Sequence, residues 1–252
     1  NQYHIENIKL NIDEFHINSD SVDIVNVNLF NYRNSINANC NFSKNLIKID
    51  VHDSYFQNLN LFSFKSDLLN LLNSQKIDFS STILINKDSI NGSSFVKYKN
   101  SNLDLEFVKN INDFNFNYKS NLKLEDFPFE NSYFNNIDSL QLSGNIDINQ
   151  SDFMICNGLI DSEYGTIEFE VYETNTKEFD YKCNLVNIDL GKLTDQPRFG
   201  KFNGNVNFNS INNKFSNFYS KINSLSFNGY DYHNISVKEN IIEDNLVDYI
   251  ID

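Results

Sequence analysis

FDYKCNLVNIDLGKLTDQPRFGKFNGNVNFNS (residues 179–210) opens the stretch that decides the fold class, and KINSLSFNGYDYHNISV (221–237) closes it. Apolar and polar residues alternate through most of it, which is the period of a half-buried β-strand. The LGKL segment at 190–193 interrupts the alternation, which then resumes as FNGNVNF. The pattern therefore predicts strands that are joined, at one point, by a short helix or turn.

The same alternation recurs along most of the 252-residue chain, and it is cleanest in LQLSGNIDIN at 140–149. Another helical segment is indicated only by DLLNLLNSQ at 67–75. No flexible linker or change of composition marks a second domain. We therefore expect one repetitive all-β domain over residues 1–252, built as a long, curved, antiparallel meandering sheet with one or two short helices.

Charge and composition exclude several classes of partner. The chain has 34 acidic and 20 basic residues, a formal net charge of −14. This balance argues against nucleic-acid binding, which requires a basic surface, and against docking on anionic lipid headgroups. No apolar run approaches the roughly 18 residues that a spanning helix needs. Because the chain begins at Asn1 without a Met or a leader, we interpret it as a piece of a longer protein or a processed product.

No arrangement of residues in the chain predicts catalysis, a cofactor or a metal site. Ser94 and Lys97 match the SxxK pattern, but the segment is predicted to be a strand, in which residues three apart point to opposite faces. The acids of residues 161–165 are explained by a turn before the next strand. Asp104 and Glu106 share one face of a strand, and Leu103 and Leu105 lie on the other. We therefore predict that the face with the two acids is exposed to solvent. We therefore predict that the protein is not an enzyme.

The remaining reactive side chains are dispersed. The four histidines lack metal-ligand spacing and are predicted to be solvated: His4, His16, His52 and His233. The three cysteines, Cys40, Cys156 and Cys183, form no CxxC motif. Cys40 and Cys183 are in phase with apolar neighbours and are predicted to be buried free thiols that act as small hydrophobic residues. One disulfide among the three stays open. Asn is unusually abundant, and we attribute much of it to compositional bias at exposed positions.

Four segments resemble the TamB translocation and assembly module of Bacteroidetes type, within the AsmA-like family. They are DLGKL at 189–193, FGKFNGNV at 199–206, the stretch from Ile222 to Val237, and the preceding strand DSEYGTIEFE at 161–170. The family unit matched best covers residues 161–250. The resemblance implies a sheet folded like a taco around an open apolar groove. These motifs are structural and carry no catalytic residue.

The resemblance also implies a function. It predicts a periplasmic protein of the cell envelope that conducts phospholipids between the inner and outer membranes or aids outer-membrane protein assembly. Its implied partners are phospholipid acyl chains, an outer-membrane β-barrel of the BamA/TamA type, and the inner membrane through an anchor outside this chain. The predicted groove lining consists of alternating apolar residues: Leu140, Leu142, Ile146, Ile148, Ile167, Phe169, Val171, Tyr181, Leu185, Phe202, Val206, Phe208, Leu225 and Phe227.

Two other classes of protein stay open at this level. A surface or secreted β-repeat protein with an adhesive role would have a closed core and apolar patches on its outside. A β-helical glycan-active enzyme would require clustered carboxylates in a cleft. The observation that best distinguishes these classes is whether the sheet closes on itself or leaves a groove.

Overall fold

The computed structural model of the chain describes residues 9–30, 34–56, 76–126, 137–148, 154–173, 178–211, 214–243 and 246–251. It divides into two compact units, each considered by itself below. Unit one comprises residues 1–118 and 126–128, and unit two comprises residues 119–125 and 129–252. None of the helices in the described part of the chain is long and apolar enough to cross a membrane.

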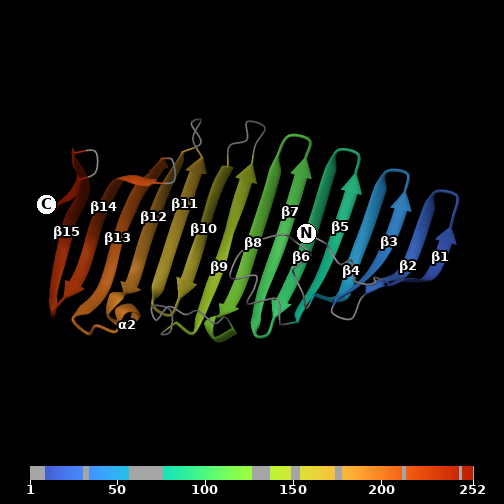
Figure 1. The fold of residues 1–252 in the computed structure, drawn as a ribbon, viewed down its shortest axis with the longest axis horizontal. Helices are drawn as coiled ribbons and strands as arrows, with labels where there is room; N and C mark the ends of the chain where they lie inside the picture. The colour runs from blue at the N-terminus through green and yellow to red at the C-terminus, as the bar shows by residue number, and fades with distance from the viewer. Residues whose placement is uncertain are drawn as a thin grey trace, which may run out of the picture. The chain divides into compact units, whose positions relative to one another are not determined.

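Unit one is an antiparallel meander, in which each strand pairs with the next one along the chain (Figure 1). Its strands are β1 (Lys9–Ile17), β2 (Ser21–Phe30), β3 (Asn34–Ser43), β4 (Leu46–Phe56), β5 (Ile77–Asn86), β6 (Ser89–Tyr98) and β7 (Ser101–Asn110). The strand β8 (Phe114–Lys123) and the 3-10 turn η2 (Leu124–Asp126) cross the boundary between the units. Among the described residues β1 is the first strand, and it pairs with β2 alone.

Unit two has the same architecture. Its strands are β9 (Ser139–Ile148), β10 (Met154–Ser162), β11 (Gly165–Glu173), β12 (Phe179–Asp189), β13 (Phe199–Ile211), β14 (Lys214–Phe227), β15 (Tyr230–Glu243) and β16 (Leu246–Ile251). Among the described residues β16 is the last strand, and it pairs with β15 alone. The predicted all-β fold with an open, curved antiparallel sheet is therefore confirmed.

The LGKL interruption forms the short helix α2 (Leu190–Thr194) between β12 and β13. Asp189 caps its N-terminus by accepting a hydrogen bond from the Lys192 backbone N–H at 3.1 Å. Asp195 ends it in the left-handed conformation, at φ 52°. The predicted helix at 67–75 lies outside the described residues.

β-bulges bend several strands, and Asn or Asp residues form them. Asn26, Asp53 and Asn187 have positive φ angles of 52°, 44° and 53°, and each lies where the strand register shifts. Asn and Asp tolerate this conformation better than other non-glycine residues. The Asn26 N–H donates to Asn39 Oδ1 at 2.9 Å, and the Asn187 N–H to Asn203 Oδ1 at 2.7 Å. Part of the Asn content is therefore structural, which compositional bias alone does not explain.

Few apolar side chains are fully buried. In the described residues the buried hydrophobic set is Ala38, Ile77, Tyr98, Leu124, Ile137 and Ile188. A closed sandwich or barrel of this length would bury far more, because a chain of about 250 residues normally encloses a sizeable core. Each unit is instead built around a single layer of strands.

Candidate functional site

One face of unit two carries apolar residues in rows that run across the strands. Directly opposed residues of an antiparallel sheet lie on the same face, so the strand register defines each row. The central row, called the middle row below, passes from β9 to β13: Gly144, Gly158, Phe169, Cys183 and Val206. It continues through Ser220 of β14 to Val237 of β15.

Two further rows flank the middle row on this face. One consists of Ile146, Cys156, Val171, Tyr181 and Phe208, and the other of Leu142, Ile160, Ile167, Leu185, Gly204, Ile222 and Ile235. In the first of them the Tyr181 and Phe208 rings stack, with centroids 4.7 Å apart. At the α2 end of the strands, Phe199 and Phe227 contact each other with centroids 5.0 Å apart. We call these rows together the apolar face of unit two.

The register places the predicted groove residues on this face. Eleven of them belong to the three rows or extend them along β9: Leu140, Leu142, Ile146, Ile148, Ile167, Phe169, Val171, Tyr181, Leu185, Val206 and Phe208. Phe208 stacks in the row of Tyr181, Phe202 pairs with Leu225, and Phe227 pairs with Phe199. What these residues contact in solution stays a prediction.

Unit one has an apolar face of its own, which the sequence-based set of groove residues left out. One row runs from β1 to β7 through Phe15, Ile24, Cys40, Ile49, Ile83, Gly92 and Phe107. A second consists of Ile17, Val22, Phe42, Ile47, Ile85 and Ile90. The alternation within each strand indicated which residues of unit one are apolar on one face. Only the pairing register shows that these residues line up into rows across the strands.

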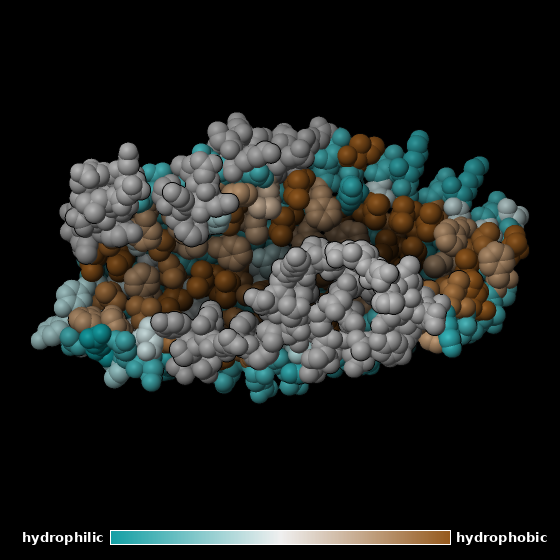
Figure 2. Space-filling model, in the orientation of Figure 1, coloured by the Kyte–Doolittle hydropathy of each residue, from teal (hydrophilic) through white to brown (hydrophobic). Residues whose placement is uncertain are grey.

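The side chains of both apolar faces are mostly half-buried. In each unit, Figure 2 shows brown, hydrophobic side chains gathered on the face turned to the viewer, with hydrophilic side chains at its margins. Contact with same-face neighbours covers part of each side chain, and the remainder stays accessible. A contiguous accessible apolar surface of this kind marks an interaction site, because soluble proteins rarely expose large apolar patches.

The three cysteines are free and half-buried, and all belong to these apolar rows. Burial raises the pKa of the Cys156 and Cys183 thiols above the usual range. At Cys40 burial has the largest effect, and the carboxylate of Asp50 raises the pKa further. The prediction of free thiols at Cys40 and Cys183 in phase with apolar neighbours is thus confirmed, but both are half-buried where full burial was expected, because the single-layered sheet leaves one side of each apolar face accessible.

Cys183 is expected to react with iodoacetamide more slowly than an exposed cysteine, because only the thiolate is nucleophilic and its pKa is raised. The pH at which its alkylation rate reaches half-maximum should lie above that of an exposed thiol. We would measure the rate by mass spectrometry with Cys40 and Cys156 changed to serine. Asn205→Cys in a cysteine-free chain is the matched control, since Asn205 is exposed on the opposite face of β13. Equal pH profiles for the two positions would contradict the burial of Cys183.

The opposite face of unit two is polar and shallowly hollowed. A hollow of about 840 Å³ is lined there by Glu168, Glu170, Lys182, Asn184 and Lys221, among others. The Asn184 amide donates to Glu168 at 2.9 Å, and the Tyr172 hydroxyl donates to Glu170 at 2.7 Å. Both carboxylates are exposed, whereas a catalytic acid is usually held in a desolvated position. These contacts are typical of a solvated sheet surface.

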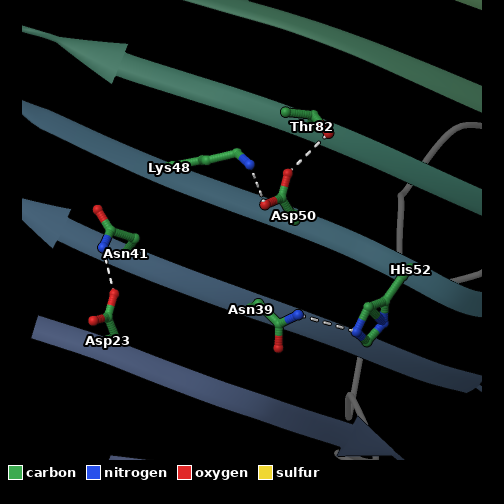
Figure 3. Close-up of polar contacts among 7 residues, drawn as sticks. All are labelled: Asp23, Asn39, Asn41, Lys48, Asp50, His52 and Thr82. Atoms are coloured by element: carbon green, nitrogen blue, oxygen red, sulfur yellow. Dashed lines mark hydrogen bonds and ion pairs between the residues drawn. The ribbon is translucent and has the colours of Figure 1, made fainter. Parts of the chain in front are cut away.

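Unit one also has a polar face, shown in Figure 3. Asp50 accepts hydrogen bonds from Lys48 at 2.7 Å and from Thr82 at 3.0 Å, and the Lys48 ammonium holds the pKa of Asp50 below its usual range. The Asn41 amide donates to Asp23. His52 lies within β4, half-buried and 3.4 Å from the Asn39 amide, so the expectation that every histidine is fully solvated is wrong at this position.

The sequence motifs considered for chemistry lie on regular strands and turns. Ser94 and Lys97 are both in β6, and the Ser94 hydroxyl contacts that of Ser81 at 2.8 Å. Asp161 accepts a hydrogen bond from Thr166 at 2.6 Å across the predicted turn before β11. In the described part of the chain, no group of three or more His, Cys, Asp or Glu side chains is arranged to hold a metal ion.

Comparisons with known proteins identify no relative of this chain. No protein-family model, no characterised protein and no solved structure matches this chain significantly. The apolar faces of the two units are therefore the structural basis of the functional proposal.

Proposed function

We propose that this protein is a structural transport protein of the bacterial envelope, whose apolar sheet faces carry the acyl chains of phospholipids. The supporting observation is the set of in-register apolar rows on a single-layered sheet. Acyl chains laid on such rows gain roughly 25 cal/mol for each Å² of apolar surface removed from water. The rows run across many strands, so they form a continuous apolar path within each unit.

The composition of the rows favours passive conduction over tight binding at one place. Within the three rows of unit two every described side chain from β9 to β13 is aliphatic, aromatic, a thiol or a glycine. No ionised group is present there to hold a headgroup at a fixed position. A chain sliding along the face therefore exchanges one apolar contact for an equivalent one, which keeps the affinity modest and uniform.

The cellular setting of the proposal rests on the resemblance of residues 161–250 to the TamB-type module. By that resemblance the protein works in the periplasm, linked to the inner membrane through an anchor outside this chain and to a BamA/TamA-type barrel in the outer membrane. Delivery of lipid to the outer membrane and assistance in outer-membrane protein assembly both use an apolar surface that is open at one side. Transport of lipid is the more direct use of apolar rows.

The alternatives fit the geometry less well. An adhesive β-repeat protein with a closed core requires many fully buried apolar residues, and the described residues have six. A glycan-active enzyme requires carboxylates sheltered from water, whereas Glu168 and Glu170 are exposed.

Direct measurement of bound lipid tests the proposal. Protein purified from bacterial cells without detergent should release phospholipid on solvent extraction, detected by mass spectrometry. Lipid-free protein incubated with phosphatidylcholine vesicles, which carry no net charge to repel this acidic protein, should show slower alkylation of Cys183, while Asn205→Cys on the polar face keeps its rate. Absence of phospholipid together with an unchanged Cys183 rate would overturn the proposal.

A further inference from the structure

The α2 end of the apolar face of unit two carries a guanidinium group. Arg198 lies in the segment between α2 and β13, and its side chain is exposed. Its Cζ atom is 5.3 Å from the centroid of the Phe199 ring and 6.0 Å from the centroid of the Phe227 ring. These two rings contact each other and belong to the apolar face. The cation therefore lies at the margin of the apolar face, where its aromatic residues meet water.

Hydrogen bonds fix the position of Arg198. The Gln196 N–H donates to the Gly191 carbonyl oxygen at 2.9 Å, and the Phe199 N–H donates to the Gln196 carbonyl oxygen at 3.0 Å. The Arg198 carbonyl oxygen accepts from the Asn228 N–H at 2.7 Å, which holds this segment against the turn between β14 and β15. The Arg198 Nε–H donates to Gln196 Oε1 at 3.0 Å. Both the backbone of Arg198 and the orientation of its guanidinium group are thus determined by the surrounding structure.

The guanidinium group has no carboxylate at ion-pair distance among the described residues, although acids outnumber bases in the chain by 34 to 20. Asp189, at the start of α2, lies instead 3.7 Å from the Lys192 ammonium group. A guanidinium group has five N–H donors, and the contact with Gln196 uses one of them. The donors on the two terminal nitrogens of Arg198 therefore remain for an acceptor that the described part of the chain does not supply.

We propose that Arg198 binds the phosphodiester group of a phospholipid whose acyl chains lie on the apolar face of unit two. This inference rests on the proposed function and adds to it the place of the headgroup. An arginine suits a phosphate because two parallel N–H groups can donate to two phosphate oxygens at once. A guanidinium group is also more weakly hydrated than an ammonium group, so it stacks on aromatic rings while its N–H donors stay available to a ligand.

The charged and the apolar parts of the lipid then lie on matching surfaces. The strand β13 leads from Phe199 through Phe202 to Phe208 along the apolar face. A strand rises about 3.3 Å per residue, so this path gives an extended acyl chain roughly 30 Å of apolar surface. The three rows hold no ionised side chain from β9 to β13, whereas Arg198 lies beyond their end. The headgroup is therefore held at the margin and the acyl chains on the rows.

Two soluble lipids with the same acyl chains separate the headgroup from the chains. Dioctanoyl phosphatidylcholine has a phosphodiester group and no net charge, whereas dioctanoylglycerol has no phosphate. Isothermal titration calorimetry on lipid-free protein would give the dissociation constant of each. Arg198→Gln should weaken binding of the phosphatidylcholine at least about fivefold and change binding of dioctanoylglycerol less than about twofold. Arg198→Lys keeps the charge without the planar fork and should give an intermediate loss.

Lys221→Gln is the matched control, because Lys221 is exposed on the polar face of unit two and its substitution removes the same charge. It should leave the dissociation constants of both lipids unchanged. Inorganic phosphate alone, titrated into the same proteins, tests whether the site takes the free anion. If phosphate binding depends on Arg198 while the affinities of both lipids do not, the assignment to a lipid headgroup is overturned.

The outcomes distinguish this inference from the proposed function. If neither lipid binds the unsubstituted protein, the proposed function fails and the headgroup site fails with it. If both lipids bind, and Arg198→Gln with an unchanged circular dichroism spectrum binds them as tightly as the unsubstituted protein does, only the headgroup site is overturned. An equal loss of affinity for both lipids in Arg198→Gln would also overturn it, because Arg198 would then support the apolar face without contacting the phosphate.

Discussion

Phe169→Lys is expected to remove most of the phospholipid that the protein binds, with at least about a tenfold loss of affinity for lipid vesicles. Phe169 is the largest side chain of the middle row and lies opposite Gly158 on one side and Cys183 on the other. A lysine there would hold its ammonium group among acyl chains, and desolvating an unpaired charge costs several kcal/mol. The lysine stem can relieve part of this cost by turning its charge toward water.

Asn157→Lys is the matched control for this experiment. Asn157 lies in β10 next to Gly158, is exposed on the polar face, and pairs in register with Glu170. The substitution changes the net charge by the same amount as Phe169→Lys. Lipid extraction, vesicle sedimentation and the thermal midpoint would be measured for both variants. We expect Asn157→Lys to bind lipid normally or slightly better on anionic vesicles.

The pattern of results separates binding on the apolar face from adsorption through charge. Equal losses in the two variants would show that a step other than contact with the middle row controls binding. Retention of lipid by a folded Phe169→Lys protein would contradict the proposed function, whatever its thermal midpoint, because the apolar path would then tolerate an unpaired charge at its centre.

The strand content of the chain was predictable because the alternation is local. Each half-buried strand shows its period of two in its own residues, and this also identified β9 and the apolar positions Ile146 and Phe169. The short helix at 190–194 was signalled by the break in alternation. These features depend on neighbours in the sequence, so no knowledge of the tertiary structure was needed.

The rows were less predictable because they depend on the bulges. At Asn187 the register shifts, so Leu185 and Ile188 approach the same side of the sheet although they are three residues apart. The same spacing of three residues separates two same-face neighbours in β1, Ile12 and Phe15, and in β2, Ile24 and Val27. A strict period of two therefore assigns one end of each bulged strand to the wrong face. An Asn or Asp between two alternating runs that differ in phase is the signal that would have located these bulges.

Gly165→Ala is expected to lower the free energy of unfolding by about 2–4 kcal/mol, a large effect for one methyl group. Gly165 begins β11 with a φ angle of +128°, outside the range that other residues adopt easily. An added Cβ atom would lie 2.7 Å from the carbonyl oxygen of Asn187 and 2.8 Å from the Cα atom of Ile188. These atoms are backbone, so they cannot move aside as a flexible side chain would.

The contact matters because it fixes the turn before β11 onto the bulge of β12. The Asp189 N–H donates to the Tyr164 carbonyl oxygen at 2.7 Å, at the position where α2 begins. Displacing Gly165 would therefore weaken the turn, the bulge and the cap of α2 together. Loss of this cluster should also lower protection from hydrogen exchange in β11 and β12 before the rest of unit two opens.

Gly229→Ala is the control that isolates the steric effect. Gly229 also has a positive φ angle, +79°, but no atom lies within 4 Å of the position that its Cβ would occupy. Its substitution should cost only the conformational penalty, about 1 kcal/mol. Urea unfolding followed by circular dichroism would compare the two variants. Similar losses of stability would mean that the turn at Gly165 does not pack against the Asn187 bulge, and the α2 end of the apolar face would then lack its principal support.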